Sequence, residues 1–188
     1  MSELSEPRIP PQPPEDWDEE LRPWLEAGRE DRPRLGDMNI FTTLVRHPEL
    51  FKTWMPFAGF MLLGAKLPFA DRELLILRTG YLCRSPYEWG QHARIAADGG
   101  IDREIVDRVP KGAEADGWDE RQRLLLRAAD ELHADARISD DTWDGLAEHL
   151  DEQQLMEVPI LVGQYHLVAF TLNSLGIERE DGVPPLPS

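Results

Sequence analysis

The stretch 70-ADRELLILRTGYLCRSPYEWGQHARIAADGG-100 contains two helix patterns separated by a tight break. Four leucines recur at helical spacing between residues 70 and 83, which predicts a first helix there. Arg84-Ser85-Pro86 interrupts the pattern, and a second helix is expected to run to about residue 97, before Gly99 and Gly100. Because the break is so short, the two helices are expected to be antiparallel neighbours.

The rest of the chain from about residue 37 also follows helical rather than alternating periodicity. Pro48 is placed to start a helix, and Ser139 and Asp151 are placed to cap the last two. Pro159 lies inside the final helix and predicts a kink or a break there. The fold class expected is therefore all-α. The further helices are expected over residues 48–63, 101–109 and 118–136.

The N-terminal region differs in composition from the remainder. Residues 1–16 are rich in proline and acidic residues, which predicts an extended arm. Two tryptophans and two leucines then recur at helical spacing and predict a short amphipathic helix over residues 17–28. We therefore divide the chain into an arm with this helix, a helical domain and a C-terminal tail, with boundaries at 1–36, 37–180 and 181–188.

Composition excludes several classes of partner. Of 188 residues, 36 are acidic and 20 are basic, a net charge of −16 that repels phosphate backbones and anionic lipid. Neither nucleic acid nor a membrane is expected as a partner. The most apolar stretch, 55–70, is broken by Lys66 and Pro68, and the N-terminus lacks the pattern of a signal peptide, so a cytoplasmic location is expected.

The single cysteine, Cys83, excludes an intramolecular disulfide and a two-cysteine redox cycle within one chain. His92, His133, His149 and His166 are dispersed, with no His-x-x-x-His or Glu-x-x-His pair among them. No phosphate-binding glycine loop and no Gly-x-Ser-x-Gly nucleophile motif is present either. The sequence therefore predicts no metal site and no cofactor.

Glu88 and His92 are the residues whose spacing suggests chemistry. They are four residues apart, so in a helix they share a face, where a carboxylate can fix the tautomer of an imidazole and raise its pKa. Glu73 in the preceding helix could approach His92 from across the interface. Two acids and an imidazole within apolar helices indicate a proton-transfer site. Tyr87 and Trp89 flank it and are candidates for substrate binding.

Each of these residues also has a structural interpretation. Ser85 and Glu88 have the spacing of a capping box, so Glu88 could serve only the start of a helix. Glu73 could complement a helix dipole, and His92 could be a core histidine bonded to a carbonyl. Tyr87 and Trp89 could be packing residues. Periodicity alone leaves the function open.

A resemblance favours the catalytic interpretation. The patterns Glu73-Leu74-x-x-Leu77 and Tyr87-Glu88-Trp89-x-x-His92, with the later Gly99-Gly100-Ile101, resemble the carboxymuconolactone decarboxylase family, which includes alkylhydroperoxidase D-type proteins. The resemblance covers roughly residues 38–178. In the peroxidase branch two cysteines precede the histidine, and Ser85 and Glu88 occupy those positions here. Cys83 matches neither, so the chain resembles the branch without the paired redox cysteines.

The resemblance implies a cofactor-free lyase, similar to a decarboxylase, acting on a small acidic or lactone-like compound. In this interpretation Glu88 holds His92, which protonates carbon or stabilises an oxyanion, while Glu73 relays the proton. The alternatives are a non-catalytic or structural family member and, less favoured, a peroxide-defence protein.

The resemblance also implies a homo-oligomer: a dimer, trimer or hexamer. Apolar residues on more than one helix face, among them Phe57, Phe60, Met61 and Leu62, agree with this expectation. The arm with Trp17 and Trp24 is expected to reach across a subunit boundary, the alternative being that it folds back on its own domain.

Overall fold

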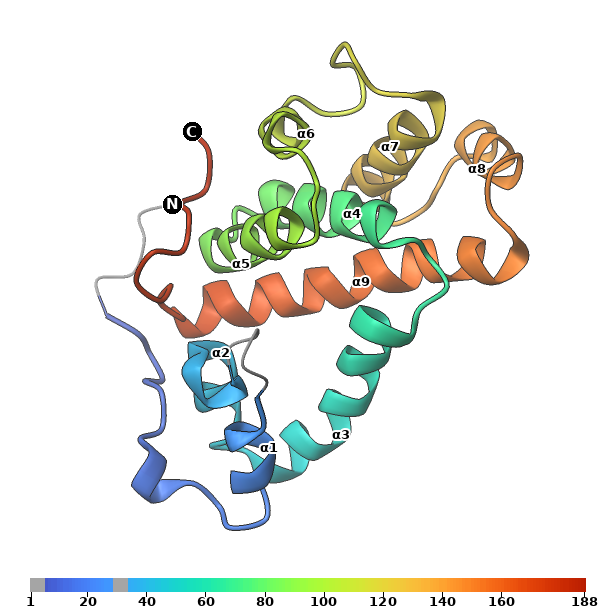
Figure 1. Cartoon of the computed structure of the whole chain (residues 1–188). Helices are drawn as coiled ribbons and strands as arrows, with labels where there is room; N and C mark the ends of the chain where they lie inside the picture. Colours follow the sequence, from blue (N-terminus) through green and yellow to red (C-terminus); the bar gives the residue numbers. More distant parts are fainter. Residues whose placement is uncertain (1–5, 29–33) are drawn as a thin grey trace.

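All regular secondary structure is helical in the part that a computed structural model describes, residues 6–28 and 34–188, with no strand in those ranges (Figure 1). The α-helices are α1 Arg22–Glu26, α2 Asn39–Leu44, α3 Pro48–Gly59, α4 Phe69–Leu82, α5 Pro86–Asp98, α6 Arg103–Arg108, α7 Glu120–Asp135, α8 Asp140–Ala147 and α9 Glu152–Leu175. A π-helical stretch, Phe60–Gly64, extends α3. The all-α prediction is confirmed.

Helix α4 lies at the centre of the structure. Every residue from 73 to 80 is buried, and α5, α7 and α9 pack around it. Figure 1 shows α9 crossing the middle of the molecule, with α4 to α8 on one side and α1 to α3 on the other. The predicted break at Arg84-Ser85-Pro86 separates α4 from α5, and the two helices pack against each other as expected.

Helix α9 continues through Pro159 as one helix of 24 residues. The prediction that the helix could break at this proline was therefore wrong. Proline removes one hydrogen-bond donor, but burial of neighbours such as Val158, Leu161 and Val162 holds the segment in place. By length and composition α9 could cross a membrane, and 56% of its most apolar window is buried inside the fold. Within this structure it acts as a core helix.

Charged side chains on α4 are paired with residues of other helices. Asp71 accepts a hydrogen bond from Arg121 of α7. Arg78 donates to Asp130 of α7 over 2.5 Å, and to the carbonyls of Val109 at 3.0 Å and Pro110 at 2.9 Å. Because a buried charge without a partner is costly, these pairs fix α7 and the loop after α6 on α4.

The described part of the arm packs on its own chain, which was the alternative kept open in the sequence analysis. Trp17, Leu21 and Leu25 are buried in one cluster with Val45 and Phe51. The Trp17 indole nitrogen donates to the carbonyl of Gln12 over 2.9 Å. The helix predicted over 17–28 is limited to the five residues of α1, and the rest of that segment packs without helical structure.

The C-terminal segment after α9 lies against α5. The Glu180 carboxylate accepts hydrogen bonds from the Tyr87 hydroxyl at 2.6 Å, from the Asn39 backbone N–H at 2.6 Å and from Gln91. A side chain at Gly90 would collide with the Pro184 carbonyl oxygen. The segment therefore approaches the α5 backbone more closely than any residue but glycine permits.

The arm contacts make a testable prediction about stability. Leu25 is fully buried, whereas the adjacent Trp24 is 39% exposed. We expect Leu25→Ala to lower the free energy of unfolding by about 2–5 kcal/mol through lost burial and a residual cavity. Trp24→Ala is the matched control and should cost about 1 kcal/mol or less. Equal, small losses in urea denaturation would show that the arm is not part of the core.

Candidate active site

Glu73 and His92 meet in the interior, as predicted. The Nδ1 atom of His92 on α5 lies 2.8 Å from Oε2 of Glu73 on α4. Glu73 is 0% exposed and His92 is 7% exposed. A hydrogen bond from Nδ1–H to a buried carboxylate fixes the imidazole tautomer and leaves Nε2 free to exchange a proton. Glu73 therefore does what the sequence analysis assigned to Glu88.

Glu88 is buried, 2% exposed, and neither of its carboxylate oxygens has a hydrogen-bond partner in the described part of the chain. The expectation that Glu88 holds His92 is thus corrected. The alternative that Glu88 forms a capping box is wrong too, since Ser85 caps α5 without a side-chain bond. Burial raises the pKa of Glu88 well above its usual value. The raised pKa favours the neutral form of the carboxyl group, which can donate a proton.

Two residues that the sequence analysis did not single out complete the site. The Tyr165 ring of α9 packs edge-on against His92, with 5.0 Å between ring centroids. Burial, and then the charges of Glu73 and Glu88, raise the pKa of Tyr165. The same two carboxylates thus act on one buried hydroxyl. The only sequence signal for Tyr165 was its place within residues 38–178, the range that the family resemblance covers.

Arg72 supplies the nearby positive charge. Its Nε atom lies 3.8 Å from Glu73 Oε1, and neither atom has a hydrogen-bond partner among the described residues. Buried polar atoms nearly always form hydrogen bonds, so a buried donor and a buried acceptor that both lack one require an explanation. Its sequence signal is weak, because an arginine beside a glutamate in a first turn is common on helix surfaces.

Tyr87 and Trp89 are both buried and occupied by structural contacts. The Tyr87 hydroxyl donates to Glu180 over 2.6 Å and accepts from the Ile40 backbone N–H at 3.3 Å. The Trp89 ring packs at 6.1 Å from that of Tyr81 in a second hydrophobic cluster. These contacts explain both residues as packing residues, and their substrate-binding role stays a prediction.

The two cysteine positions of the peroxidase branch carry no thiol. Ser85 is buried with no partner for its hydroxyl among the described residues, and Glu88 is the buried acid described above. Burial, followed by the charge of Glu88, raises the pKa of Cys83 to about 12. A thiol with this pKa carries very little thiolate at neutral pH, and the thiolate is the reactive form.

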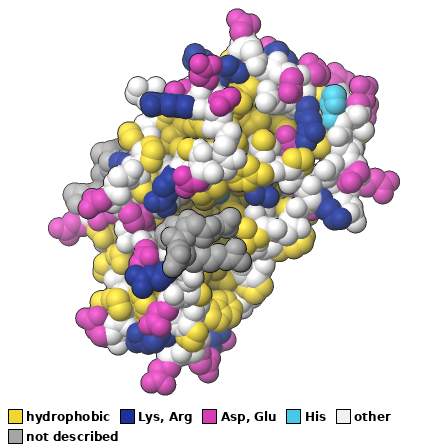
Figure 2. All heavy atoms as spheres, viewed as in Figure 1, with side chains coloured by type: hydrophobic (Ala, Val, Ile, Leu, Met, Phe, Trp, Pro, Cys, Tyr) yellow, Lys and Arg dark blue, Asp and Glu magenta, His cyan; other side chains and the backbone are white. Residues whose placement is uncertain are grey.

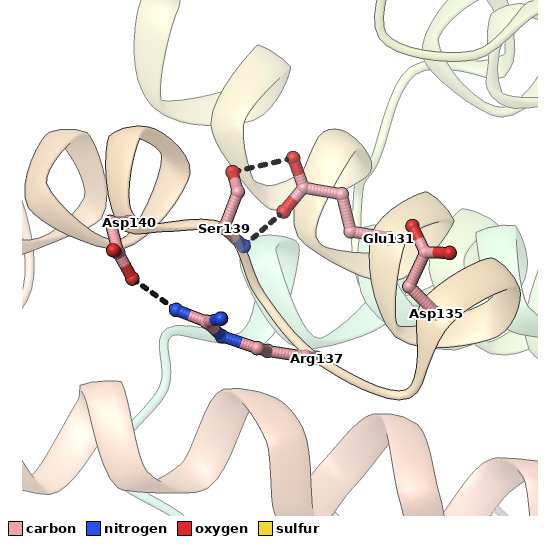
Figure 3. Close-up of a pocket in the computed structure, with 5 residues that line it drawn as sticks. All are labelled: Glu131, Asp135, Arg137, Ser139 and Asp140. Carbon is pink, nitrogen blue, oxygen red and sulfur yellow. Dashed lines mark hydrogen bonds and ion pairs between the residues drawn. The ribbon is translucent and has the colours of Figure 1, made fainter.

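A surface hollow of about 430 Å³ lies elsewhere, at the junction of α7 and α8 (Figure 3). Glu131 accepts hydrogen bonds from the Ser139 backbone N–H and hydroxyl at 2.8 and 2.9 Å, and Arg137 pairs with Asp140 over 2.5 Å. These groups satisfy one another and cap α8. The hollow is therefore explained by helix capping, and no predicted site residue lines it.

The neutral state of Glu88 predicts a pH dependence of stability. Folding raises the pKa of Glu88, so the protonated carboxyl group contributes fully to the free energy of unfolding when the pH is below the unfolded-state pKa of about 4.3. This contribution is lost as the pH rises toward the pKa of the folded state. Each pH unit in that range should cost up to about 1.4 kcal/mol. We expect wild type to lose thermal stability relative to Glu88→Gln between about pH 5 and pH 8.

Circular dichroism melts at several pH values measure this difference. Glu148→Gln, which changes an exposed glutamate, is the matched control and should follow the wild-type curve. Parallel melting curves for wild type and Glu88→Gln would contradict the raised pKa of Glu88.

Comparison with known proteins identifies the relatives of this site. The sequence pattern of the carboxymuconolactone decarboxylase family matches residues 48–131, which include Glu73, Glu88 and His92. A search of curated proteins finds no match.

Three solved structures share the fold. An uncharacterised peroxidase-related protein from Silicibacter sp. TM1040 has a TM-score of 0.82 at 16% identity, covering 97% of each chain. An alkylhydroperoxidase AhpD core protein from Ralstonia eutropha JMP134, also uncharacterised and peroxidase-related, has a TM-score of 0.76 at 20% identity, covering 94% of this chain and 98% of its own. The debrominase Bmp8, solved with 2,3,4-tribromopyrrole, has a TM-score of 0.77 at 16% identity, covering 92% and 91%.

At these identities the structural likeness concerns the fold, and the family match adds the sequence relationship. Residues 48–131 thus match the carboxymuconolactone decarboxylase family, and the chain shares the fold of the AhpD-like structures.

Proposed function

We propose that the protein is a cofactor-free lyase that transfers protons at Glu73, Glu88 and His92 on a small acidic or lactone-like compound. One observation carries the proposal: a buried His92–Glu73 pair lies one helical turn from a buried acid, Glu88, that has no partner among the described residues. A structural polar network would satisfy all its members, whereas a proton donor must keep its proton available.

The proposed reaction is a decarboxylation. The bond from the substrate carbon to its carboxylate breaks, and the electron pair moves into the adjoining carbonyl to give an enolate while CO₂ leaves. Glu88 gives its proton to the carbon, and a proton from water, passed by His92, restores the acid. Glu73 keeps the imidazole oriented and stabilises its protonated form. General acid–base catalysis of this kind contributes about 10²–10⁴ in rate.

Arg72 is our candidate for binding the carboxylate of the substrate. Its buried Nε–H has no partner among the described residues, and an acidic substrate would supply one. The site thereby gains a local positive charge in a protein whose net charge is −16. Removal of water from the substrate carboxylate destabilises it relative to CO₂ and so favours decarboxylation. The positive charge of Arg72 stabilises the carboxylate and opposes this effect.

The alternatives are a structural family member and a peroxide-defence protein. The structural alternative accounts for the hydrogen bond between Glu73 and His92 but leaves the unpartnered Glu88 unexplained. The peroxide alternative needs a thiolate and a resolving partner, whereas Cys83 is the only cysteine and its pKa is raised to about 12. The lyase interpretation is therefore favoured.

Substitution of His92 tests the proposal. We expect His92→Gln and Glu88→Gln each to lower kcat/KM by about 10² or more, because each removes a titratable group but keeps side-chain size. The assay measures CO₂ released from carboxymuconolactone and from a panel of β-keto acids. His149→Gln, at an exposed histidine outside the site, is the control and should retain activity.

A folded wild-type protein that releases no CO₂ from any of these compounds would contradict the lyase proposal for this substrate class. Activity retained by both variants, with thermal melts unchanged, would favour the structural alternative instead.

We further propose that copies of this chain associate through α9. Four exposed apolar side chains, with exposed Gly163, follow one stripe at alternating steps of four and three residues: Met156, Ile160, Leu167 and Phe170. This spacing lets two copies of one helix pack together. Phe57, Phe60 and Leu63 are also exposed, whereas Met61, expected to be exposed, is buried. Figure 2 shows hydrophobic side chains at the surface among charged ones.

Light scattering tests this association. We expect a mass that is a multiple of 21.5 kDa, reduced by Leu167→Glu, because a charge in an apolar interface is costly. Trp143→Glu, at an exposed apolar position of α8, is the control and should leave the mass unchanged. A wild-type monomer of 21.5 kDa at micromolar concentration would contradict the proposal.

A further inference from the structure

Three side chains that could bind a metal ion converge at one end of the α4, α7 and α9 packing. Cys83 follows the last turn of α4, His133 lies in the last turn of α7, and His166 lies in α9. One ligand atom from each residue lies within 4.8 Å of the other two. None of the three belongs to the proton-transfer site. Their separation along the chain hid them from sequence patterns, which is why no metal site was expected.

The ligand atoms face one another. His133 Nδ1 lies 2.9 Å from His166 Nε2 and 4.0 Å from the Cys83 sulfur. His166 Nδ1–H donates to the Val162 carbonyl over 2.8 Å, which leaves the Nε2 lone pair directed at the cluster. Metal-binding histidines characteristically donate their second ring N–H in this way, because the bond fixes the tautomer.

We propose that Cys83, His133 and His166 bind a divalent transition-metal ion, with Zn²⁺ preferred. A thiolate with two imidazoles suits a metal of borderline softness. With Zn–S near 2.3 Å and Zn–N near 2.1 Å, ligand atoms in a tetrahedral site are separated by roughly 3.3–3.6 Å. The observed 2.9 and 4.0 Å lie on either side of this range, and the ligand atoms all lie within 4.8 Å of one another.

The surroundings support both cation binding and access. Without a metal, the Cys83 thiol holds its proton, as its pKa of about 12 indicates, and the metal must displace it. The Asp130 carboxylate near His133 attracts a cation, whereas Arg78, which is paired with Asp130, opposes this attraction.

The positions of the ligands are also held by their neighbours. The Asn173 side chain donates to the Cys83 carbonyl over 2.9 Å, and the Phe170 ring packs edge-on to His166 with centroids 5.7 Å apart. His133 is exposed, which gives an ion an entry path, while Cys83 and His166 are half-buried. Three protein ligands leave the fourth tetrahedral position free for a water molecule, as in catalytic rather than structural zinc sites.

Spectroscopy of the full chain with cobalt tests the site. Co²⁺ substitutes for Zn²⁺ and reports thiolate ligation as a charge-transfer band, with intense visible bands when four-coordinate. We expect one equivalent of Co²⁺ to give both features and Zn²⁺ to displace it. Competition with a chromophoric chelator then gives the Kd for Zn²⁺. Binding should also raise the melting temperature, because the ion stabilises the folded state.

Variants separate this site from weak binding to the acidic surface. We expect Cys83→Ser to abolish the charge-transfer band. Cys83→Ser and His133→Ala should each raise the Kd for Zn²⁺ by about tenfold or more. His149→Ala, which removes an exposed histidine outside the cluster, should change neither. Melts without metal check that each variant is folded. Absence of the thiolate band, or a Kd unchanged in both cluster variants, would overturn the proposal.

Discussion

Charged side chains on a buried helix require partners, and this requirement arranges the helices around α4. Asp71, Glu73 and Arg78 are all buried on that helix. Their partners come from elsewhere: Arg121 and Asp130 from α7, and His92 from α5. Hydrophobic burial supplies the larger part of the driving force, but it is not directional. The ion pairs restrict which helix faces can meet, since a shifted helix would leave a charge without its partner.

Glu88 departs from this rule. It is buried like Glu73, yet it has no hydrogen-bond partner in the described residues, and burial raises its pKa, which favours the neutral form. An isolated acid of this kind lowers the stability of the fold at neutral pH. Functional sites commonly retain such residues because the destabilising arrangement is also the reactive one. The site thus holds two buried acids in different surroundings, one hydrogen-bonded to His92 and one without a partner among the described residues, and such a contrast is typical of acid–base pairs in enzymes.

Local sequence patterns predicted the fold and part of the site. The α4–α5 hairpin followed from leucine spacing and from the Ser85-Pro86 break, and its antiparallel geometry brought Glu73 to His92. Spacing could not tell which carboxylate reaches the imidazole, because Glu88 shares the face of His92 but points no oxygen at it. The capping box failed for the same reason: spacing permits a bond without requiring the rotamer that forms it.

Features that depend on distant packing were beyond the sequence. The Cys83, His133 and His166 cluster needs α4, α7 and α9 to be docked before it exists. The arm shows the same limit, since its periodicity predicted burial of Trp17 without indicating which surface would bury it.

The close approach of the C-terminal segment to Gly90 means that the residue at position 90 and the presence of this segment should evolve together. No side chain can be added at position 90 while Pro184 and Val183 lie against it. In a homologue that lacks this segment, position 90 would no longer require glycine. Alanine, which is the better helix former, would then be favoured in the middle of α5. Among homologues, glycine at this position should therefore be inherited together with the segment that covers it.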